Sequence, residues 1–161
     1  MWGKAKPIPE GFHTLTPYLA VRDAKRAIDF YKQAFGAQIK SVHSTPNGKV
    51  INATLQIGDS VLMLNDESPD AAHCVSPETL GGSTVTIHIY VENADETFNR
   101  AIAAGATATM PMMDAFWGDR YGQVKDPFGH RWSVATHKED LSDKEIEKRA
   151  KEMFAKMAAG H

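Results

Sequence analysis

The sequence predicts an α+β fold in which one β-α-β-β-β unit occurs twice and a helix follows the second unit. Three pairs of landmarks recur at separations of 70, 69 and 71 residues: Val21 with Val91, Gly36 with Gly105, and Gly58 with Gly129. Between these landmarks a strand pattern, a helix cap, a helix pattern, a glycine and a further strand pattern follow in the same order. So regular an offset indicates an internal duplication with two copies.

The strands of both units alternate between apolar and polar residues, which is the pattern of a strand with two different faces. In 84–91 the apolar set is Val85, Ile87, Ile89 and Val91, and the polar set is Thr84, Thr86, His88 and Tyr90. The stretch 14–21 repeats this design, and 50–57 sets Asn52, Thr54 and Gln56 against Ala53, Leu55 and Ile57. We expect helices on the apolar faces, because Thr, His and Tyr side chains need hydrogen-bond partners when they are covered.

The first module is expected over 12–66, after an irregular lead-in over 1–11. Its first strand covers roughly 12–21. Asp23 is a suitable N-cap for the helix that follows, and Gly36 is suited to end that helix. Further strands of this module are predicted over 38–45, 50–57 and 61–65.

A linker loop over 67–82 separates this module from the second one, which is expected over 83–137. Asn93 caps the second helix, Glu96 occupies the capping-box position, and Gly105 ends the helix. The strands of this module are predicted over 84–91, 106–110 and 131–136, with the segment 113–122 between the last two.

The tail, 138–161, is predicted to be helical from Ser142 to Met157, because Ser142 and Glu145 make a capping box. An apolar stripe runs along this helix through Ile146, Ala150, Met153 and Met157. Such a stripe has to be covered, either by its own domain or by a second copy of the protein. The sequence leaves both alternatives open.

Composition narrows the classes of partner. The chain has 161 residues, a formal net charge of -2 with both signs scattered, and a single cysteine, Cys74. These features predict no binding to nucleic acid and none to a membrane surface. No apolar run approaches the roughly 18 residues of a spanning helix, and the first residues lack an apolar signal core, so we expect a cytoplasmic protein.

Several motifs occur in the right order at the spacing of the repeat: Tyr18-Leu-Ala-Val-Arg-Asp, Ala27-Ile-Asp-Phe-Tyr, Ala34-Phe-Gly-Ala, Ile57-Gly-Asp-Ser and Asp126-Pro-Phe-Gly-His. With them, 12–137 resembles the vicinal-oxygen-chelate superfamily, which includes glyoxalase I, bleomycin-resistance proteins and extradiol dioxygenases. The segment Phe116-Trp-Gly-Asp-Arg-Tyr-Gly resembles its poorly characterised glyoxalase-like branch. The resemblance implies an incompletely closed eight-stranded cup with the helices outside, usually in a homodimer.

In that architecture the polar strand faces line the cup. The residues expected to look inward are Thr16, Tyr18, Asn52, Thr54, Gln56, Thr86, His88, Tyr90, Arg131 and Ser133. The alternative is that some of them face solvent on an open sheet, as antiparallel strands often do. We favour the cup, because a concave pocket is where such sheets bind ligands.

The resemblance implies metal ligands on the first and last strand of each module, and here those positions hold Thr16, Thr86, Ser133 and Met63, or Leu62 in the neighbouring register. None of these side chains is a good ligand for a divalent metal. We therefore expect no cofactor. The alternative is a relocated divalent-metal site that uses His88 or other histidines, namely His13, His43, His130 and His137.

His88 is the candidate catalytic residue, because a neutral imidazole can accept a proton or bind a polar ligand group, although it can equally be structural. Trp117, with Phe116 and Tyr121, is suited to form an aromatic rim that stacks on a planar ligand, or simply to close a hairpin. Asp119 and Arg120 stand at the expected mouth, where adjacent opposite charges are more often solvated.

The leading hypothesis is a cytoplasmic, homodimeric, metal-independent protein that binds a small, partly aromatic or amphipathic molecule in its cup, as bleomycin-resistance proteins do. We favour such a binding protein over an enzyme. The candidate ligand-binding residues are Tyr18, Asn52, Thr54, Thr86, His88, Tyr90, Trp117, Arg120 and Ser133. One alternative is a divalent-metal lyase or dioxygenase with relocated ligands. Another is an interaction module that docks a protein on its C-terminal helix.

Overall fold

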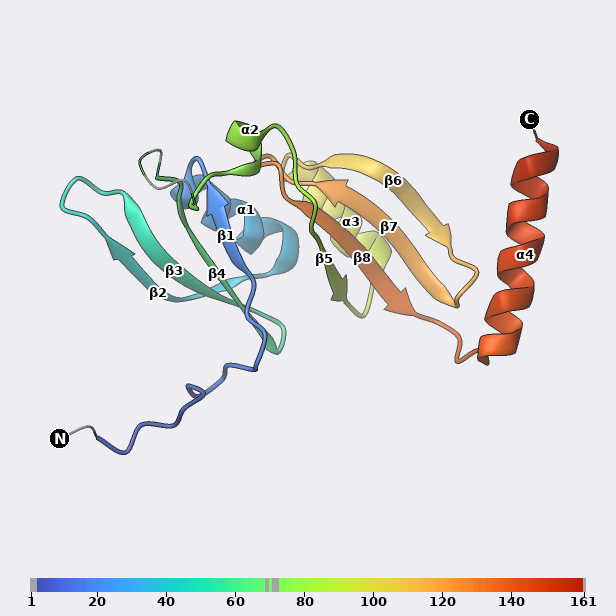
Figure 1. Ribbon diagram of the computed structural model, residues 1–161, viewed down its shortest axis with the longest axis horizontal. Coiled ribbons are helices and arrows are strands. Elements are labelled where there is room, and N and C mark those ends of the chain that lie inside the picture. Colours follow the sequence, from blue (N-terminus) through green and yellow to red (C-terminus); the bar gives the residue numbers. More distant parts are fainter. Residues whose placement is uncertain (1–2, 69, 71–72, 161) are drawn as a thin grey trace.

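The computed structural model describes residues 3–68, 70 and 73–160. Expectations for 1–2, 69, 71–72 and 161, in the lead-in, the linker and the tail, lie outside the described residues. The first module consists of β1 (Tyr18–Val21), α1 (Ala24–Phe35), β2 (Gln38–Ser44), β3 (Val50–Ile57) and β4 (Ser60–Asp66). The second consists of β5 (Thr86–Tyr90), α3 (Ala94–Ala103), β6 (Thr107–Asp114), β7 (Asp119–Lys125) and β8 (Arg131–His137). A short helix, α2 (Pro77–Leu80), joins them, and α4 (Asp143–Ala159) follows (Figure 1).

The predicted duplication is confirmed by the topology of the sheets. Their strand orders are β1-β4-β3-β2 and β5-β8-β7-β6, so equivalent strands occupy equivalent places. In each sheet the first strand pairs in parallel with the last. Even the helix starts match. The Asp66 carboxylate accepts from the Ala24 N–H at 2.8 Å, and the Thr136 hydroxyl accepts from the Ala94 N–H at 2.8 Å.

Several element boundaries differ from the predicted ones. β1 begins only at Tyr18, and it follows Pro17, which has no N–H to donate to a neighbouring strand. β5 is shorter than 84–91, while β6 extends beyond 106–110 to Asp114. The segment 113–122, for which no strand was predicted, contains the end of β6 and the start of β7. The linker contains α2, whose N-cap is Ser76.

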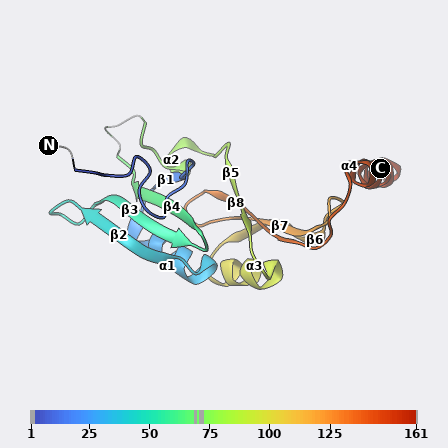
Figure 2. The same ribbon diagram turned by 90° about the horizontal axis from the view of Figure 1, so that it is seen from below.

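The two modules meet through their helices and a shared aromatic core, with α1 and α3 on the same side of the sheets (Figure 2). Phe30, Tyr31, Phe35, Phe128 and Trp132 pack ring against ring across the boundary, with Phe35 and Trp132 centroids 4.6 Å apart. The buried Asp126 carboxylate accepts from Tyr31 Oη at 2.5 Å and from Trp132 Nε1 at 2.9 Å. Burial and the neighbouring Asp126 raise the pKa of Tyr31 well above its ordinary value, so its hydroxyl keeps the proton that it donates.

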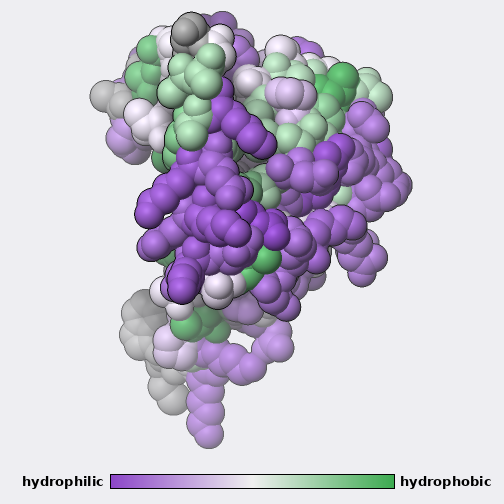
Figure 3. All heavy atoms as spheres, turned by 90° about the vertical axis from the view of Figure 1, so that its right-hand side faces the viewer, coloured by the Kyte–Doolittle hydropathy of each residue, from purple (hydrophilic) through white to green (hydrophobic). Residues whose placement is uncertain are grey.

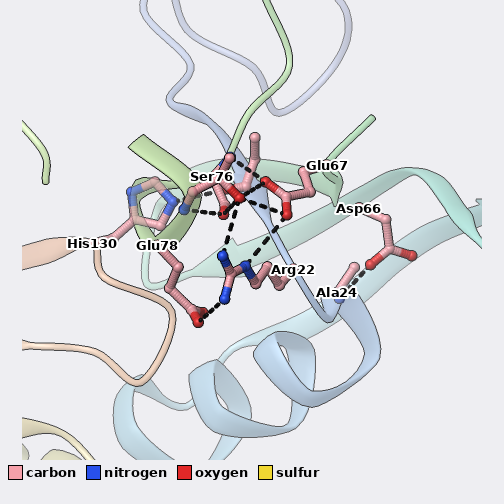
Figure 4. Close-up of polar contacts among 9 residues, drawn as sticks. Arg22, Ala24, Asp66, Glu67, Ser76, Glu78 and His130 are labelled. Atoms are coloured by element: carbon pink, nitrogen blue, oxygen red, sulfur yellow. Dashed lines mark hydrogen bonds and ion pairs between the residues drawn. The ribbon is translucent and has the colours of Figure 1, made fainter. Parts of the chain in front are cut away.

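A network of polar contacts holds the linker against the first module (Figure 4). The Glu67 carboxylate accepts from the Ser76 N–H at 2.7 Å and from Thr79 Oγ1 at 2.8 Å, and Arg22 lies between Glu67 and Glu78. From the second module, the His130 imidazole contacts the Ala20 carbonyl at 2.9 Å. Specific contacts therefore fix how the two modules are placed relative to each other. In this placement the outer edge of β5 has no strand partner among the described residues.

The predicted fold class is confirmed: the sheets are unclosed, they are covered by helices on one face, and a C-terminal helix follows them. Within the described part of the chain they remain two four-stranded sheets that share no strand pairing. α4 stands beyond the end of the second sheet, away from α3 (Figure 2). Across the described ranges, no helix has the length and apolar character that crossing a membrane requires.

Candidate functional site

The open face of the second sheet carries a row of polar side chains from three neighbouring strands. His88 on β5, Ser133 on β8 and Gln123 on β7 are partners in the sheet register. His88 Nδ1 lies 2.6 Å from Ser133 Oγ, and Gln123 Nε2 donates to Tyr121 Oη at 2.7 Å. Because Nδ1 of His88 is engaged by Ser133, Nε2 is the ring nitrogen that remains for a ligand.

Aromatic rings extend from this histidine toward one end of the sheet. The His88 ring meets Tyr90 edge-on at 4.6 Å and stacks with Tyr121 at 5.9 Å. Trp117 lies 5.0 Å from Tyr121, and Phe116 lies 5.0 Å from Trp117. We call these five rings the aromatic row. Trp117, Phe116 and Tyr121 therefore lie in contact with one another, and such rings offer faces and edges on which a planar ligand can stack.

The buried carboxylate of Asp119 holds two rings of the aromatic row in place through hydrogen bonds. Asp119 is 2% exposed, and its Oδ2 accepts from Tyr90 Oη at 3.1 Å and from Trp117 Nε1 at 3.0 Å. Its Oδ1 lies 2.7 Å from Nδ1 of His137. Burial alone would raise the pKa of the Asp119 carboxyl, but the hydrogen bonds from His137, Trp117 and Tyr90 hold it below its ordinary value. Asp119 is therefore a charged anchor that fixes two rings of the row.

Sequence reasoning missed this anchor, because Asp119 and Arg120 were interpreted as adjacent, solvated loop charges. In β7 their side chains point to opposite faces of the sheet. Arg120 faces α3, where it makes a bidentate pair with Asp95 at 3.0 Å and contacts Asp114 at 3.3 Å. The signal that could have found Asp119 is its alternation with Tyr121 and Gln123 along one strand face.

The first sheet carries a second polar group on its own open face. Asn52 Nδ2 donates to Tyr18 Oη at 2.9 Å and lies 3.7 Å from Met63 Sδ, while Thr54 Oγ1 donates to Asn52 Oδ1 at 3.3 Å. The residues of the predicted site therefore separate into two groups. Tyr18, Asn52 and Thr54 share the first sheet, whereas Thr86, His88, Tyr90, Trp117 and Ser133 belong to the second. Arg120 joins neither group.

A crevice of about 1260 Å³ lies between the modules beside the edge of β5. Its walls include apolar residues from both modules: Leu15, Phe35, Leu62, Ile87, Ile89 and Trp132. Of the predicted site residues, His88 and Tyr90 border it, and His137 does so as well. The polar row of the second sheet thus stands next to a hollow that is somewhat larger than the roughly 300–1,000 Å³ of ordinary small-ligand pockets.

A divalent metal ion, the group that the resemblance implies, does not fit the residues at the expected positions. Thr16, Met63, Thr86 and Ser133 offer hydroxyls and a thioether in place of imidazoles and carboxylates. Nor do the described residues contain a group of three or more His, Cys, Asp or Glu side chains able to hold an ion. His130 and His137 are instead engaged by the Ala20 carbonyl and by Asp119 with Asp140.

Known proteins resemble this chain along most of its length. The sequence model of the Glyoxalase/Bleomycin resistance protein/Dioxygenase superfamily matches residues 11–134. The uncharacterized protein Rv0887c of Mycobacterium tuberculosis is 44% identical over 135 residues, which cover 83% of this chain and 79% of that protein. TioX from Micromonospora sp. ML1 has a similar crystal structure, with a TM-score of 0.61 and 28% identity over 78% of this chain and 98% of its own. Protein PA1353 from Pseudomonas aeruginosa shares the fold at a TM-score of 0.64 and 24% identity, covering 79% of this chain and 99% of its own.

Proposed function

Because the chain belongs to the Glyoxalase/Bleomycin resistance protein/Dioxygenase superfamily, we propose that it is a cytoplasmic protein that binds a small, partly aromatic molecule without a metal ion. The observation that carries this proposal is His88, bonded to Ser133 at 2.6 Å, flanked by Tyr90 and Tyr121, and open to a crevice of about 1260 Å³. Sequestration of the molecule, in the manner of a bleomycin-resistance protein, is the activity that such a site supports best.

The roles of the side chains follow from their chemistry. The aromatic row offers stacking surface to a planar head group. His88 Nε2 can donate to or accept from a polar atom of the ligand, because Ser133 can adjust its hydroxyl proton to either tautomer. The apolar wall of the crevice, which includes the exposed Leu15 and the half-buried Ile89, removes further ligand surface from water. None of these contacts needs a charged group on the ligand.

A homodimer is part of the proposal, with the first sheet of one copy completing the cup over the second sheet of the other. The support for a homodimer is that a single chain, over the part that the structure describes, leaves a strand edge unpaired and apolar side chains exposed beside it. The outer edge of β5, rich in β-branched residues and free of Lys and Pro, has no strand partner among the described residues. Beside the equivalent strands β1 and β5, Leu15 is 88% and Val85 63% exposed. A second copy would cover these edges and bring Tyr18 and Asn52 toward a shared ligand.

Calorimetric titration with methyl 4-hydroxybenzoate, a planar phenol ester, tests the binding function directly. We expect saturable binding by the wild-type protein, at least tenfold weaker binding by His88→Ala, and unchanged binding by His43→Ala, whose exposed side chain lies on edge strand β2. Absence of binding to the wild-type protein would contradict the proposal.

Metal content tests the enzyme alternative. Protein purified without chelator is expected to contain substoichiometric zinc, nickel and manganese by elemental analysis. Stoichiometric metal that disappears in His88→Ala would instead favour a lyase or dioxygenase with relocated ligands. Sedimentation equilibrium is expected to give the mass of two chains, and the mass of one chain would contradict the shared cup.

A further inference from the structure

The segment that leads to α4 is seated on the turn that carries Trp117. The Gly118 carbonyl accepts from the N–H groups of Lys138 and Glu139 at 2.9 and 3.0 Å. Gly118 itself has a φ of +99°, and a Cβ at this position would lie 2.6 Å from the Glu139 carbonyl oxygen. The turn and the segment therefore fit each other through close backbone contact, which only glycine permits here.

A side-chain relay connects the same segment to the aromatic row. Nε2 of His137 lies 2.7 Å from Asp140, and its Nδ1 lies 2.7 Å from Asp119. Asp119 in turn holds Tyr90 and Trp117. The base of α4 is thus tied to the carboxylate that positions two rings of the proposed ligand site.

The helix also continues the aromatic row with its own side chains. The Phe154 ring on α4 lies 6.5 Å from the Phe116 ring, which is the last member of the row. Phe154 is 59% exposed and Met157, one turn further on, is 57% exposed, so their apolar surface is available. Elsewhere on the helix Arg149 pairs with Glu139 and Glu145. Figure 3 shows the side of the molecule on which α4 lies, and the middle of this surface is largely hydrophilic.

We propose that α4 is the end wall of the ligand site, and that Phe154 and Met157 contact an apolar extension of a ligand whose planar head lies on the aromatic row. The inference rests on the proposed function and specifies how the ligand lies: an aromatic head on the aromatic row and an alkyl or aryl tail against α4. A flexible methionine beside a phenylalanine suits such a tail, because methionine adapts to irregular apolar shapes. Neighbouring rings from His88 to Phe154, with centroids 5.0 to 6.5 Å apart, form an unbroken path from the head contact to the tail contact.

The experiment compares two probes that differ only in tail length, methyl and heptyl 4-hydroxybenzoate, by calorimetric titration. Each methylene group removed from water strengthens binding by roughly fourfold when fully buried. With a wall on one side, we expect the heptyl ester to bind the wild-type protein at least about thirtyfold more tightly than the methyl ester. In the double variant Phe154→Ser with Met157→Ser this gain is expected to fall to about threefold, with the methyl ester affinity unchanged.

Lys151→Ser with Lys156→Ser is the matched control, because it places two serines at other exposed positions of the same helix and should keep the full heptyl gain. Equal heptyl gain in the wild-type protein and in the Phe154 and Met157 double variant would overturn the wall while leaving the proposed function intact. A double variant that keeps both affinities but loses dimer mass in sedimentation would assign this face to a second copy instead. Failure of both esters to bind the wild-type protein would overturn both proposals.

Discussion

His88 Nδ1 and Ser133 Oγ lie 2.6 Å apart across the parallel pair β5–β8, at the positions that Tyr18 and Met63 occupy across β1–β4 in the first module. In the first module Asn52 contacts both members of the equivalent pair. The duplication has thus kept two polar groups at the same place in each sheet. Their chemistry differs, and the imidazole belongs to the module that also carries the aromatic row.

Ser133→Ala is expected to weaken binding of methyl 4-hydroxybenzoate by roughly three- to tenfold, less than His88→Ala does. The reason is that Ser133 acts by holding the imidazole and fixing its tautomer. Calorimetric titration of both single variants and of the double variant checks this. Loss in the double variant is expected to be smaller than the two single losses combined, and full additivity would argue against a joint role.

Asp119→Asn is expected to lower the free energy of unfolding by about 2 kcal/mol, because an amide N–H₂ would replace one oxygen of a buried acceptor that receives three donors. Urea denaturation followed by far-ultraviolet circular dichroism measures it. Asp140→Asn is the matched control, since the Asp140 side chain is exposed, and it should change stability little. Equal effects of the two substitutions would mean that burial of Asp119 contributes nothing.

The contact between His137 and Asp119 is expected to depend on pH. Hydrogen bonds to Asp119 and then to Asp140 raise the pKa of His137 above its ordinary 6.5. A raised pKa in the folded state means that the stabilising effect is fully present below pH 6.5 and is lost as the pH rises through the raised value. Melting temperatures of wild-type protein and His137→Gln should therefore differ most below pH 6.5 and converge as the pH rises past the raised pKa of His137.

His43→Gln serves as the control for that pH series, because His43 is an exposed residue on the edge strand β2. Its melting temperatures are expected to follow those of the wild-type protein throughout. A difference between wild-type protein and His137→Gln that grows with rising pH would contradict the sign of the predicted effect.

Tyr31→Phe is expected to destabilise the protein by about 1 to 3 kcal/mol, because it removes a hydroxyl that donates to the buried Asp126 carboxylate across the module boundary. Tyr18→Phe is the control. The Tyr18 side chain is about half exposed, and its loss should cost little. Urea titrations monitored by tryptophan fluorescence compare the two, and an equal cost would show that the boundary contact is unimportant.

Gly118→Ala is expected to loosen the base of α4, because the added Cβ would strike the Glu139 carbonyl and the residue has a positive φ. A cost of roughly 1 to 3 kcal/mol and faster proteolytic removal of α4 should follow. Gly11→Ala separates the two causes, since Gly11 also has a positive φ but open space around its Cβ. If both variants lose α4 at the wild-type rate, the seat on Gly118 does not hold the helix.

The sequence by itself determined the two modules, the faces of the strands that it predicted, the helix caps and the helical tail. Each of these features is encoded by alternation, spacing or cap chemistry within a short stretch of the chain. It can therefore be predicted without knowing which distant residues come into contact. Asn93 and Ser142, for example, cap their helices as their positions predict.

Only the tertiary structure decided which polar residues work together. Asp119 becomes a buried anchor and Arg120 a partner of α3 because the register of β7 against β8 assigns their faces, and that register depends on residues 18 positions away. The seat of α4 on Gly118 and the separation of the two polar groups depend equally on contacts between segments remote in sequence. Such contacts leave no local periodicity for a sequence pattern to report.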